Sequence, residues 1–323
     1  MPDMEYVFAS NNRIFGCKGS MIYVSGTGGT EPDPYNFNRF EGLKTDSCVM
    51  EVDGEGDFTG GIDYNGYPMF FKENDVFKLY GSYPENYQLI RYRFSGVDSG
   101  CGRSLAVAGQ YLFYVSHGVV YEYSGGVPHN ISRALGEWRL CDASAATDGQ
   151  KYYLSAKDQN GERRLLVYDT AYNRWIIEDD TEILFFGYAD GVWIADGSGK
   201  VHTLGEYLSR EAPYSGAEVT KEDGKNLSFS FESANFYLGN GVKKRLHELT
   251  LRMEVSEGAA VQAYIRYDGG EKELIRKWEK KQMGGYTIPL TPRDCDSFRL
   301  YIEGKGQMKL YGITMRYMNG RNR

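Results

Sequence analysis

Short stretches of alternating apolar and polar residues, separated by tight turns, dominate the chain and predict β-strands throughout. The segment Asp57–Gly81 shows this most clearly, because apolar runs flank an Asn65-Gly66 turn and a third run follows the polar residues Glu73–Asp75. Asn-Gly between apolar runs is a strong hairpin signal, since both turn positions need positive φ, which Asn and Gly tolerate. We therefore predict three antiparallel strands in this segment.

Related units of three or four short strands recur along the first two-thirds of the chain. Their spacing is about 40 to 47 residues, measured between the aromatic residues that mark one strand of each unit: Tyr23, Phe70, Phe113, Tyr153 and Trp193. Such a repeat is typical of a β-propeller, in which radial packing covers both faces of each sheet. Consecutive immunoglobulin-like sandwiches are the alternative, but they would need about 100 residues each. We predict a β-propeller of about five blades over residues 1–205.

The character of the sequence changes after residue 205. Residues 206–224 are polar, carry few strand signals and are interpreted as a linker. From 225 to 323 the predicted strands are longer and alternate more strictly; in Leu249–Val255, apolar residues occupy every second position. Seven such strands predict a C-terminal β-sandwich. The fold class is therefore all-β, with Ser132–Trp138 as the only short helix candidate.

Composition and charge narrow the function classes. Of the 323 residues, 41% are hydrophobic and 15% aromatic, which allows a sizeable core. The net charge is −7 and no basic block occurs, which argues against binding to nucleic acid, sequence-specific binding included. No stretch reaches the roughly 18 apolar residues of a membrane span, and residues 1–10 lack the pattern of a signal peptide. We expect synthesis in a cytoplasm and no membrane partner.

No motif for a metal, a cofactor or a catalytic nucleophile stands out. The five cysteines are widely spaced without a Cys-x-x-Cys pair, which predicts reduced thiols. The four histidines form no zinc motif, and Gly-x-Ser-x-Gly does not occur. Asp53–Asp57 and Asp196–Gly199 offer carboxylates, but neither has the spacing of a calcium loop, so both are interpreted as turns. We predict no metal and no cofactor.

Two acidic pairs, Asp179-Asp180 and Asp294/Asp296, suggest a glycosidase, which needs two carboxyl groups about 5–9 Å apart across a cleft. With 44 acidic residues in the chain, such neighbours also arise by chance. We therefore assign no catalytic residue. Tyrosines in the outer strand of the second unit and in the loop Glu31–Tyr35 are candidates for an interface: Tyr83, Tyr87, Tyr92 and Tyr35.

Several segments resemble phage and prophage tail proteins: Asn12–Cys17, Ile22–Ser25, Asp57–Gly60, Phe70–Asn74, Tyr80-Gly81, Gly125–Ser132, Val167–Asp169 and Trp175. Nearly the whole chain is similar to the propeller-containing tail nozzle, or tail stabilisation, proteins of short-tailed phages. The likeness extends to a paired-strand domain after the propeller.

This resemblance implies a non-catalytic structural component of a phage or prophage tail (neck, nozzle or tail-tip scaffold) and therefore no enzyme. It implies a place in the virion tail after synthesis in the bacterial host cytoplasm. The partners would be other tail structural proteins, with a homo-oligomeric ring around the DNA exit channel, and a negative channel would not trap DNA. The alternative is a carbohydrate-binding or glycan-processing β-propeller that recognises a host surface.

Overall fold

The computed structural model describes residues 1–27, 35–177, 183–188, 191–203, 221–222, 225–226, 228–237 and 243–319. Nearly all of its regular structure is β-strand. The chain forms two compact units, Met1–Ser209 and Arg210–Arg323, and each is described by itself. The predicted boundaries (1–205, 206–224 and 225–323) stay predictions, since most of the predicted linker lies outside the described residues.

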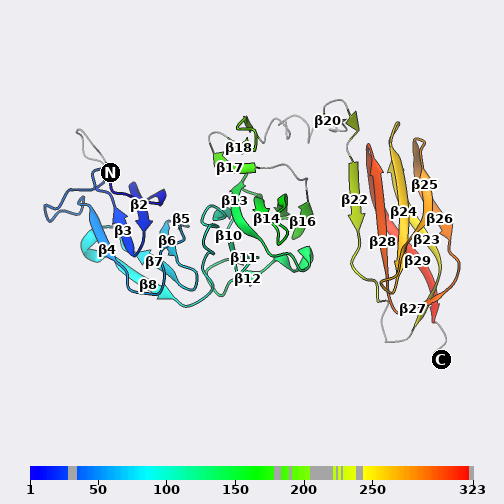
Figure 1. The fold of residues 1–323 in the computed structure, drawn as a ribbon, viewed down its shortest axis with the longest axis horizontal. Helices are drawn as coiled ribbons and strands as arrows, with labels where there is room; N and C mark the ends of the chain where they lie inside the picture. Colours follow the sequence, from blue (N-terminus) through cyan, green and yellow to red (C-terminus); the bar gives the residue numbers. More distant parts are fainter. Residues whose placement is uncertain are drawn as a thin grey trace. The chain divides into compact units, whose positions relative to one another are not determined.

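The first unit is a five-bladed β-propeller whose blades are antiparallel meanders (Figure 1). Blade 1 contains β1 (Tyr6–Ser10), β2 (Arg13–Lys18), β3 (Met21–Val24) and β4 (Cys48–Glu51). Blade 2 contains β5 (Gly60–Tyr64), β6 (Tyr67–Phe71), β7 (Val76–Tyr80) and β8 (Gln88–Tyr92). Blade 3 contains β9 (Ala106–Ala108), β10 (Tyr111–Ser116), β11 (Val119–Tyr123) and β12 (His129–Asn130). Blade 4 contains β13 (Cys141–Thr147), β14 (Lys151–Lys157), β15 (Arg163–Asp169) and β16 (Arg174–Ile177). The described strands of blade 5 are β17 (Ile183–Tyr188), β18 (Val192–Asp196) and β19 (Val201–Thr203).

The predicted Asn65-Gly66 hairpin is confirmed. Tyr64 and Tyr67 pair directly at the ends of β5 and β6. Asn65 and Gly66 have φ angles of 54° and 79°, and positive φ at both central positions is what a two-residue type I′ turn requires. The local turn chemistry therefore sets the register of blade 2.

In blade 1, the aromatic residue chosen to measure the repeat lies on the wrong strand. Phe70, Phe113, Tyr153 and Trp193 lie on the second strands of their blades, whereas Tyr23 lies on β3. The equivalent residue on β2 is Phe15. A long connection between β3 and β4 lengthens the first repeat, so Tyr23 matched the period without sharing the position.

A buried arginine anchors that long connection to blade 1. Arg13 is 1% exposed, and its guanidinium donates hydrogen bonds of 2.6 Å to three main-chain carbonyls, those of Ser25, Lys44 and Asp46. A buried charge needs such partners because its hydration is lost. Arg13 thus ties the residues after β3 and before β4 to β2, alongside main-chain hydrogen bonds in the same region.

Apolar clusters shared by neighbouring blades hold the propeller together. The second strands carry apolar residues on both faces: Phe70 packs with blade 1, whereas Phe71 packs with blade 3. In blade 4, Tyr152 faces blade 3 and Tyr153 faces blade 5. Phe113 stacks on Tyr152 with ring centroids 5.1 Å apart. Each such buried ring contributes roughly 2–3 kcal/mol, so every blade depends on its neighbours.

The second unit is a β-sandwich, as predicted. One sheet has the order β22-β28-β24-β25. In the other sheet, β29 pairs along one edge of β23, and β26 and β27 pair with successive parts of its other edge. Leu249, Leu251, Met253 and Val255 are fully buried in its single core, which confirms the predicted alternation. The bounds are β22 (Ser228–Glu232), β23 (Lys244–Val255), β24 (Ala260–Tyr267), β25 (Lys272–Trp278), β26 (Gln282–Pro289), β27 (Asp294–Cys295), β28 (Phe298–Lys305) and β29 (Met308–Asn319). A separate short pair comprises β20 (Lys221–Glu222) and β21 (Lys225–Asn226).

Helices are almost absent from the described residues. The candidate at Ser132–Trp138 is a single 3-10 turn, η2 (Ser132–Leu135), which ends at Gly136 with φ 79°. A second turn, η1 (Pro84–Asn86), precedes β8. Neither could cross a membrane, and the described part of the chain contains no longer helix.

Candidate functional site: an axial pocket

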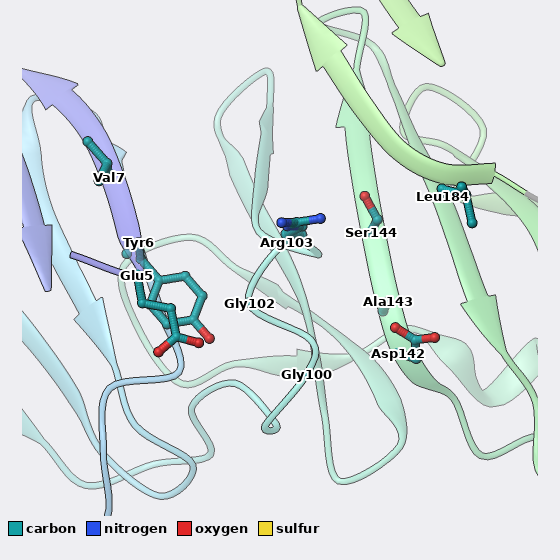
Figure 2. Close-up of a pocket in the computed structure, with 11 residues that line it drawn as sticks. Glu5, Tyr6, Val7, Gly100, Gly102, Arg103, Asp142, Ala143, Ser144 and Leu184 are labelled. Carbon is teal, nitrogen blue, oxygen red and sulfur yellow. The ribbon is translucent and has the colours of Figure 1, made fainter. Parts of the chain in front are cut away.

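The first strands of the blades lie side by side at the centre of the propeller, β1 beside β5, β9 beside β13 and β13 beside β17. A pocket of about 460 Å³ opens near their beginnings, a volume suited to a small ligand. We call it the axial pocket (Figure 2). Its lining comes from four blades and from the segment that precedes β9: Glu5, Tyr6, Val7, Gly61, Gly100, Gly102, Arg103, Asp142, Ala143, Ser144 and Leu184.

A bend in β13 presents Asp142 at this pocket. The pairing of β13 with β14 shifts register between Cys141 and Ser144, which marks a β-bulge or a related irregularity. Asp142 has φ 47°, in the left-handed region that residues other than glycine seldom adopt. Bulges change the direction of a side chain and occur often beside active sites, where strained backbone is also concentrated. The irregular backbone is a reason to suspect a functional role for Asp142.

Two cations hold the Asp142 carboxylate in its charged form. Lys157 Nζ lies 2.8 Å and Arg163 Nη2 2.5 Å from Asp142 Oδ2. The hydrogen bond from Lys157, together with the positive charges of Lys157 and Arg163, lowers the pKa of Asp142. The carboxylate is therefore ionised at neutral pH. These contacts also connect β13 with β14 and β15.

Glu5 and Tyr6 form the facing wall of the axial pocket (Figure 2). The main chain of Glu5 is fixed by a hydrogen bond from its N–H to Cys17 O, of 3.1 Å. Burial and the Glu5 carboxylate raise the pKa of Tyr6 to about 12, although the nearby charge of Arg103 acts in the opposite direction. Tyr6 thus keeps its hydroxyl proton as a hydrogen-bond donor beside Glu5. No described cation forms an ion pair with Glu5.

Arg103 lies between these two walls (Figure 2). It forms an isolated parallel bridge with Ser144, and Ala145 N donates a 2.8 Å hydrogen bond to Arg103 O. The main chain is therefore fixed across the boundary between blades 3 and 4. Within the described residues, the guanidinium makes no hydrogen bond or ion pair. The pocket thus combines two carboxylates, one cation and two hydroxyl groups.

A second cavity, of about 500 Å³, is lined by later residues of the same first strands. Its lining is mostly apolar and includes Ile62, Val107 and Phe186. Its acidic residue, Asp148, is already bonded, because it accepts hydrogen bonds from Lys151 N and from the Tyr153 hydroxyl. Reactive groups are therefore found in the axial pocket rather than here.

The tyrosines predicted to form an interface do not line the axial pocket. Tyr83 precedes η1 and lies under Lys44 Nζ, 4.7 Å from its ring centroid. Tyr87 is half-buried against the core shared by blades 1 and 2, and Tyr92 shares a 3.1 Å hydrogen bond with Tyr80. These rings are therefore partly occupied in packing. Tyr35 is 39% exposed, while the rest of its loop, residues 31–34, lies outside the described residues. Their interface role stays a prediction.

The acidic pairs considered from the sequence do not form a described site. Asp179 and Asp180 lie outside the described residues. Asp294 forms a two-pronged ion pair with Arg245, at 2.9 and 3.0 Å. Asp196 accepts main-chain hydrogen bonds within its own turn, as its interpretation as a turn requires. Within the described residues, no group of three or more His, Cys, Asp or Glu side chains could hold a metal ion.

Sequence reasoning missed Glu5, Arg103 and Asp142. Each lies at or just before the first strand of its unit, a position where propeller strands converge. A charged residue near the start of the first strand in three of the units was the signal that could have indicated a common site. The bend at Asp142 has no turn motif in the sequence, so its direction could not be predicted.

No family model and no curated protein matches the chain. Among solved structures, the exo-β-1,3-galactanase of Phanerochaete chrysosporium with galactose is 10% identical over 94% of this chain and 95% of its own, with a TM-score of 0.30. A protein described as a glycoside hydrolase is 10% identical over 94% and 83%, with a TM-score of 0.26. A bifunctional GH43-CE protein of Bacteroides eggerthii is 11% identical over 93% and 62%, with a TM-score of 0.25.

These comparisons correct the predictions that came from the tail-protein resemblance. The matched structures are glycoside hydrolases rather than phage tail proteins, so that resemblance is wrong. The same finding overturns the non-catalytic tail role, the prediction that the chain is no enzyme, and the place in the virion tail. The predictions about partners remain untested. At these TM-scores we transfer no residue of these enzymes to this chain, and the function below rests on the axial pocket.

Proposed function

We propose that the propeller is a glycan-processing domain that binds a carbohydrate in the axial pocket and hydrolyses a glycosidic bond. One observation carries the proposal: Glu5 and Asp142 come from different blades and line facing walls of a single pocket. Glycoside hydrolysis commonly uses two carboxyl groups, one on each side of the scissile bond. The pocket supplies such a pair together with polar neighbours.

The surroundings of the two carboxyl groups suit different roles. Asp142 is kept ionised by Lys157 and Arg163, so it fits the nucleophile or the base that activates water at the anomeric carbon. Glu5 forms no ion pair with a described cation, and from the facing wall it fits the acid that gives its proton to the leaving-group oxygen. Tyr6 keeps its proton and can donate a hydrogen bond to a sugar oxygen or to Glu5. Different surroundings for two carboxyl groups are the expected basis of such a division.

Hydrolysis of a panel of oligosaccharides and aryl glycosides by the full chain tests the proposal. We expect turnover of at least one substrate, and Glu5→Gln and Asp142→Asn should each lower kcat by about 10²- to 10⁴-fold. Glu55→Gln and Asp53→Asn are matched controls, because both residues are exposed in a turn outside the pocket. Their rates should equal that of the unaltered protein.

Circular dichroism of every variant separates lost chemistry from lost fold. The proposal is wrong if the folded protein turns over no substrate of the panel. It is also wrong if both pocket variants retain full kcat on a substrate that is cleaved.

A further inference from the structure

Two arginines, Arg103 in the axial pocket and Arg163 beside it, differ in their hydrogen bonding. Arg163 is bonded within the fold, since it donates hydrogen bonds from Nη1 and Nη2 to Asp142 O and Oδ2 at 3.0 and 2.5 Å. The guanidinium of Arg103 makes no hydrogen bond or ion pair with a described residue, yet it lines the axial pocket. None of its five N–H donors is used by a described residue, and a ligand in the pocket can accept from them.

Ser144 lies directly beside Arg103 in this pocket. The two residues are partners in a parallel bridge, so their side chains leave adjacent main chains on the same side. Both line the axial pocket, and the Ser144 hydroxyl makes no hydrogen bond within the described residues (Figure 2). A planar guanidinium with a neighbouring hydroxyl matches the geometry and charge of a carboxylate better than those of a neutral sugar hydroxyl.

The charges around the pocket favour the same conclusion. Lys157 and Arg163 already neutralise Asp142, whereas Arg103 has no such partner among the described residues. Glu5 on the facing wall would repel an anion and direct it toward the side of Arg103 and Ser144. Complementary charge of this kind determines specificity and orientation in a binding site.

We infer that the axial pocket selects an acidic sugar, with Arg103 and Ser144 binding the carboxylate of a uronic acid residue. This inference rests on the proposed function and names its substrate class. Arg103 is a specificity residue here, because it holds the substrate's carboxylate at a distance from the bond that is cleaved. Glu5 and Asp142 keep the chemical roles given above.

Calorimetric titration of the full chain with monosaccharides tests the inference. The probes are glucuronate and galacturonate, their neutral counterparts glucose and galactose, and acetate. We expect each uronate to bind at least about tenfold more tightly than its neutral counterpart, the scale of one charge-assisted bidentate contact. The preference should weaken as salt increases, because screening acts on exposed charges.

Substitutions at Arg103 assign the preference to this residue. Arg103→Ala should abolish the difference between acidic and neutral sugars, and Arg103→Lys should retain part of it because the charge stays while the fork is lost. Arg133→Ala is the matched control, since Arg133 is an exposed arginine on η2 outside the pocket. Circular dichroism checks that each variant is folded.

The outcomes separate this inference from the proposed function. Uronate binding that depends on Arg103, without hydrolysis of any uronide, supports the inference and contradicts the function. Hydrolysis of neutral glycans, without tighter binding of acidic sugars, supports the proposed function and contradicts the inference. Equal binding of acetate and uronate, a preference that survives in Arg103→Ala, or no binding of either sugar would each overturn the inference.

Discussion

The propeller and the sandwich bury their apolar residues in different ways. In the sandwich, the 12-residue strands β23 and β29 pair along their lengths, and one core fills the space between two sheets. In the propeller, the strands have two to seven residues, and the apolar faces are divided among clusters shared by successive blades. A sandwich strand thus needs one apolar face, whereas the second strand of a propeller blade needs two.

This difference explains where each unit can carry chemistry. Both faces of a blade are committed to packing, so polar side chains are free to converge only at strand ends, as Glu5, Arg103 and Asp142 do. The sandwich instead leaves one face of each sheet to solvent, and its ion pairs, such as Arg245–Asp294, connect neighbouring strands. Packing requirements in the propeller therefore concentrate its polar chemistry at one place.

Truncation of core side chains should cause the largest losses of unfolding free energy, and each loss should be confined to the unit that carries the substitution. Phe113→Ala in the propeller and Leu251→Ala in the sandwich each remove a fully buried side chain. We expect losses of about 3–5 kcal/mol and about 2–5 kcal/mol in unfolding free energy, respectively. Hydrogen exchange followed peptide by peptide should show lost protection only in the unit that carries the substitution. Equal loss of protection in both units would contradict this separation.

Substitution of two buried cations, Arg13 and Lys244, should cause the next largest losses of unfolding free energy. Arg13→Met removes three hydrogen bonds to main-chain carbonyls, whereas Lys244→Met in the sandwich removes one, to Asn319 Oδ1 at 2.8 Å. At about 1 kcal/mol for each bond, we expect losses of about 3 and about 1 kcal/mol. Chemical denaturation of both variants provides the measurement. A larger effect of the Lys244 variant would show that the number of hydrogen bonds does not decide the cost.

Substitution of turn glycines should lower the unfolding free energy by less than the buried-cation variants do. The loss should be the same in both units. Gly66 and Gly269 have φ angles of 79° and 72°, and an added Cβ would meet little or nothing at either position. Substitution by alanine should therefore cost about 1 kcal/mol each, from backbone strain alone. Thermal unfolding of the two variants tests this. Unequal costs would mean that the turns are not equivalent.

Acidification should produce the smallest change in unfolding free energy, through the protonation of one carboxylate in each unit. The pKa of Asp142 is lowered by Lys157 and Arg163, and that of Glu232 in the sandwich is lowered by hydrogen bonds from Arg299 and Tyr301 despite the opposing effect of burial. A lowered folded-state pKa stabilises above the ordinary carboxyl pKa, and this stability is lost as pH falls through the lowered value.

Both carboxylates are partly exposed, so each contribution should stay below about 1 kcal/mol. The unaltered protein should exceed Asp142→Asn and Glu232→Gln in stability at pH 7, and the difference should vanish near pH 2. A difference that grows on acidification would contradict the assigned directions.

Local patterns predicted much of the fold, because strand alternation and turn chemistry are properties of neighbouring residues. The Asn65-Gly66 hairpin in blade 2 and the buried alternation of Leu249–Val255 in the sandwich were both predicted and are both observed. The sites at which distant strands meet were not predictable in this way. Glu5 and Asp142 lie 137 residues apart in the numbering, and only the succession of blades brings them to one pocket.

Two further misses have the same origin. The assignment of Tyr23 followed a period that a long connection had shifted, so the correct residue, Phe15, depended on strand pairing across blade 1. The direction of Asp142 depends on an irregular pairing of β13 with β14. Residue types alone do not specify either feature, because each is a property of two strands together.

The shared clusters also set an order in which the nascent chain can fold on the ribosome. Blade 1 has no complete core until blade 2 has been synthesised, and the cluster of blades 2 to 4 closes only when Tyr168 has emerged. The axial pocket, whose lining runs from Glu5 to Leu184, is completed only after the first strand of blade 5. Stalled chains that end before residue 184 would therefore carry folded blades without a finished site.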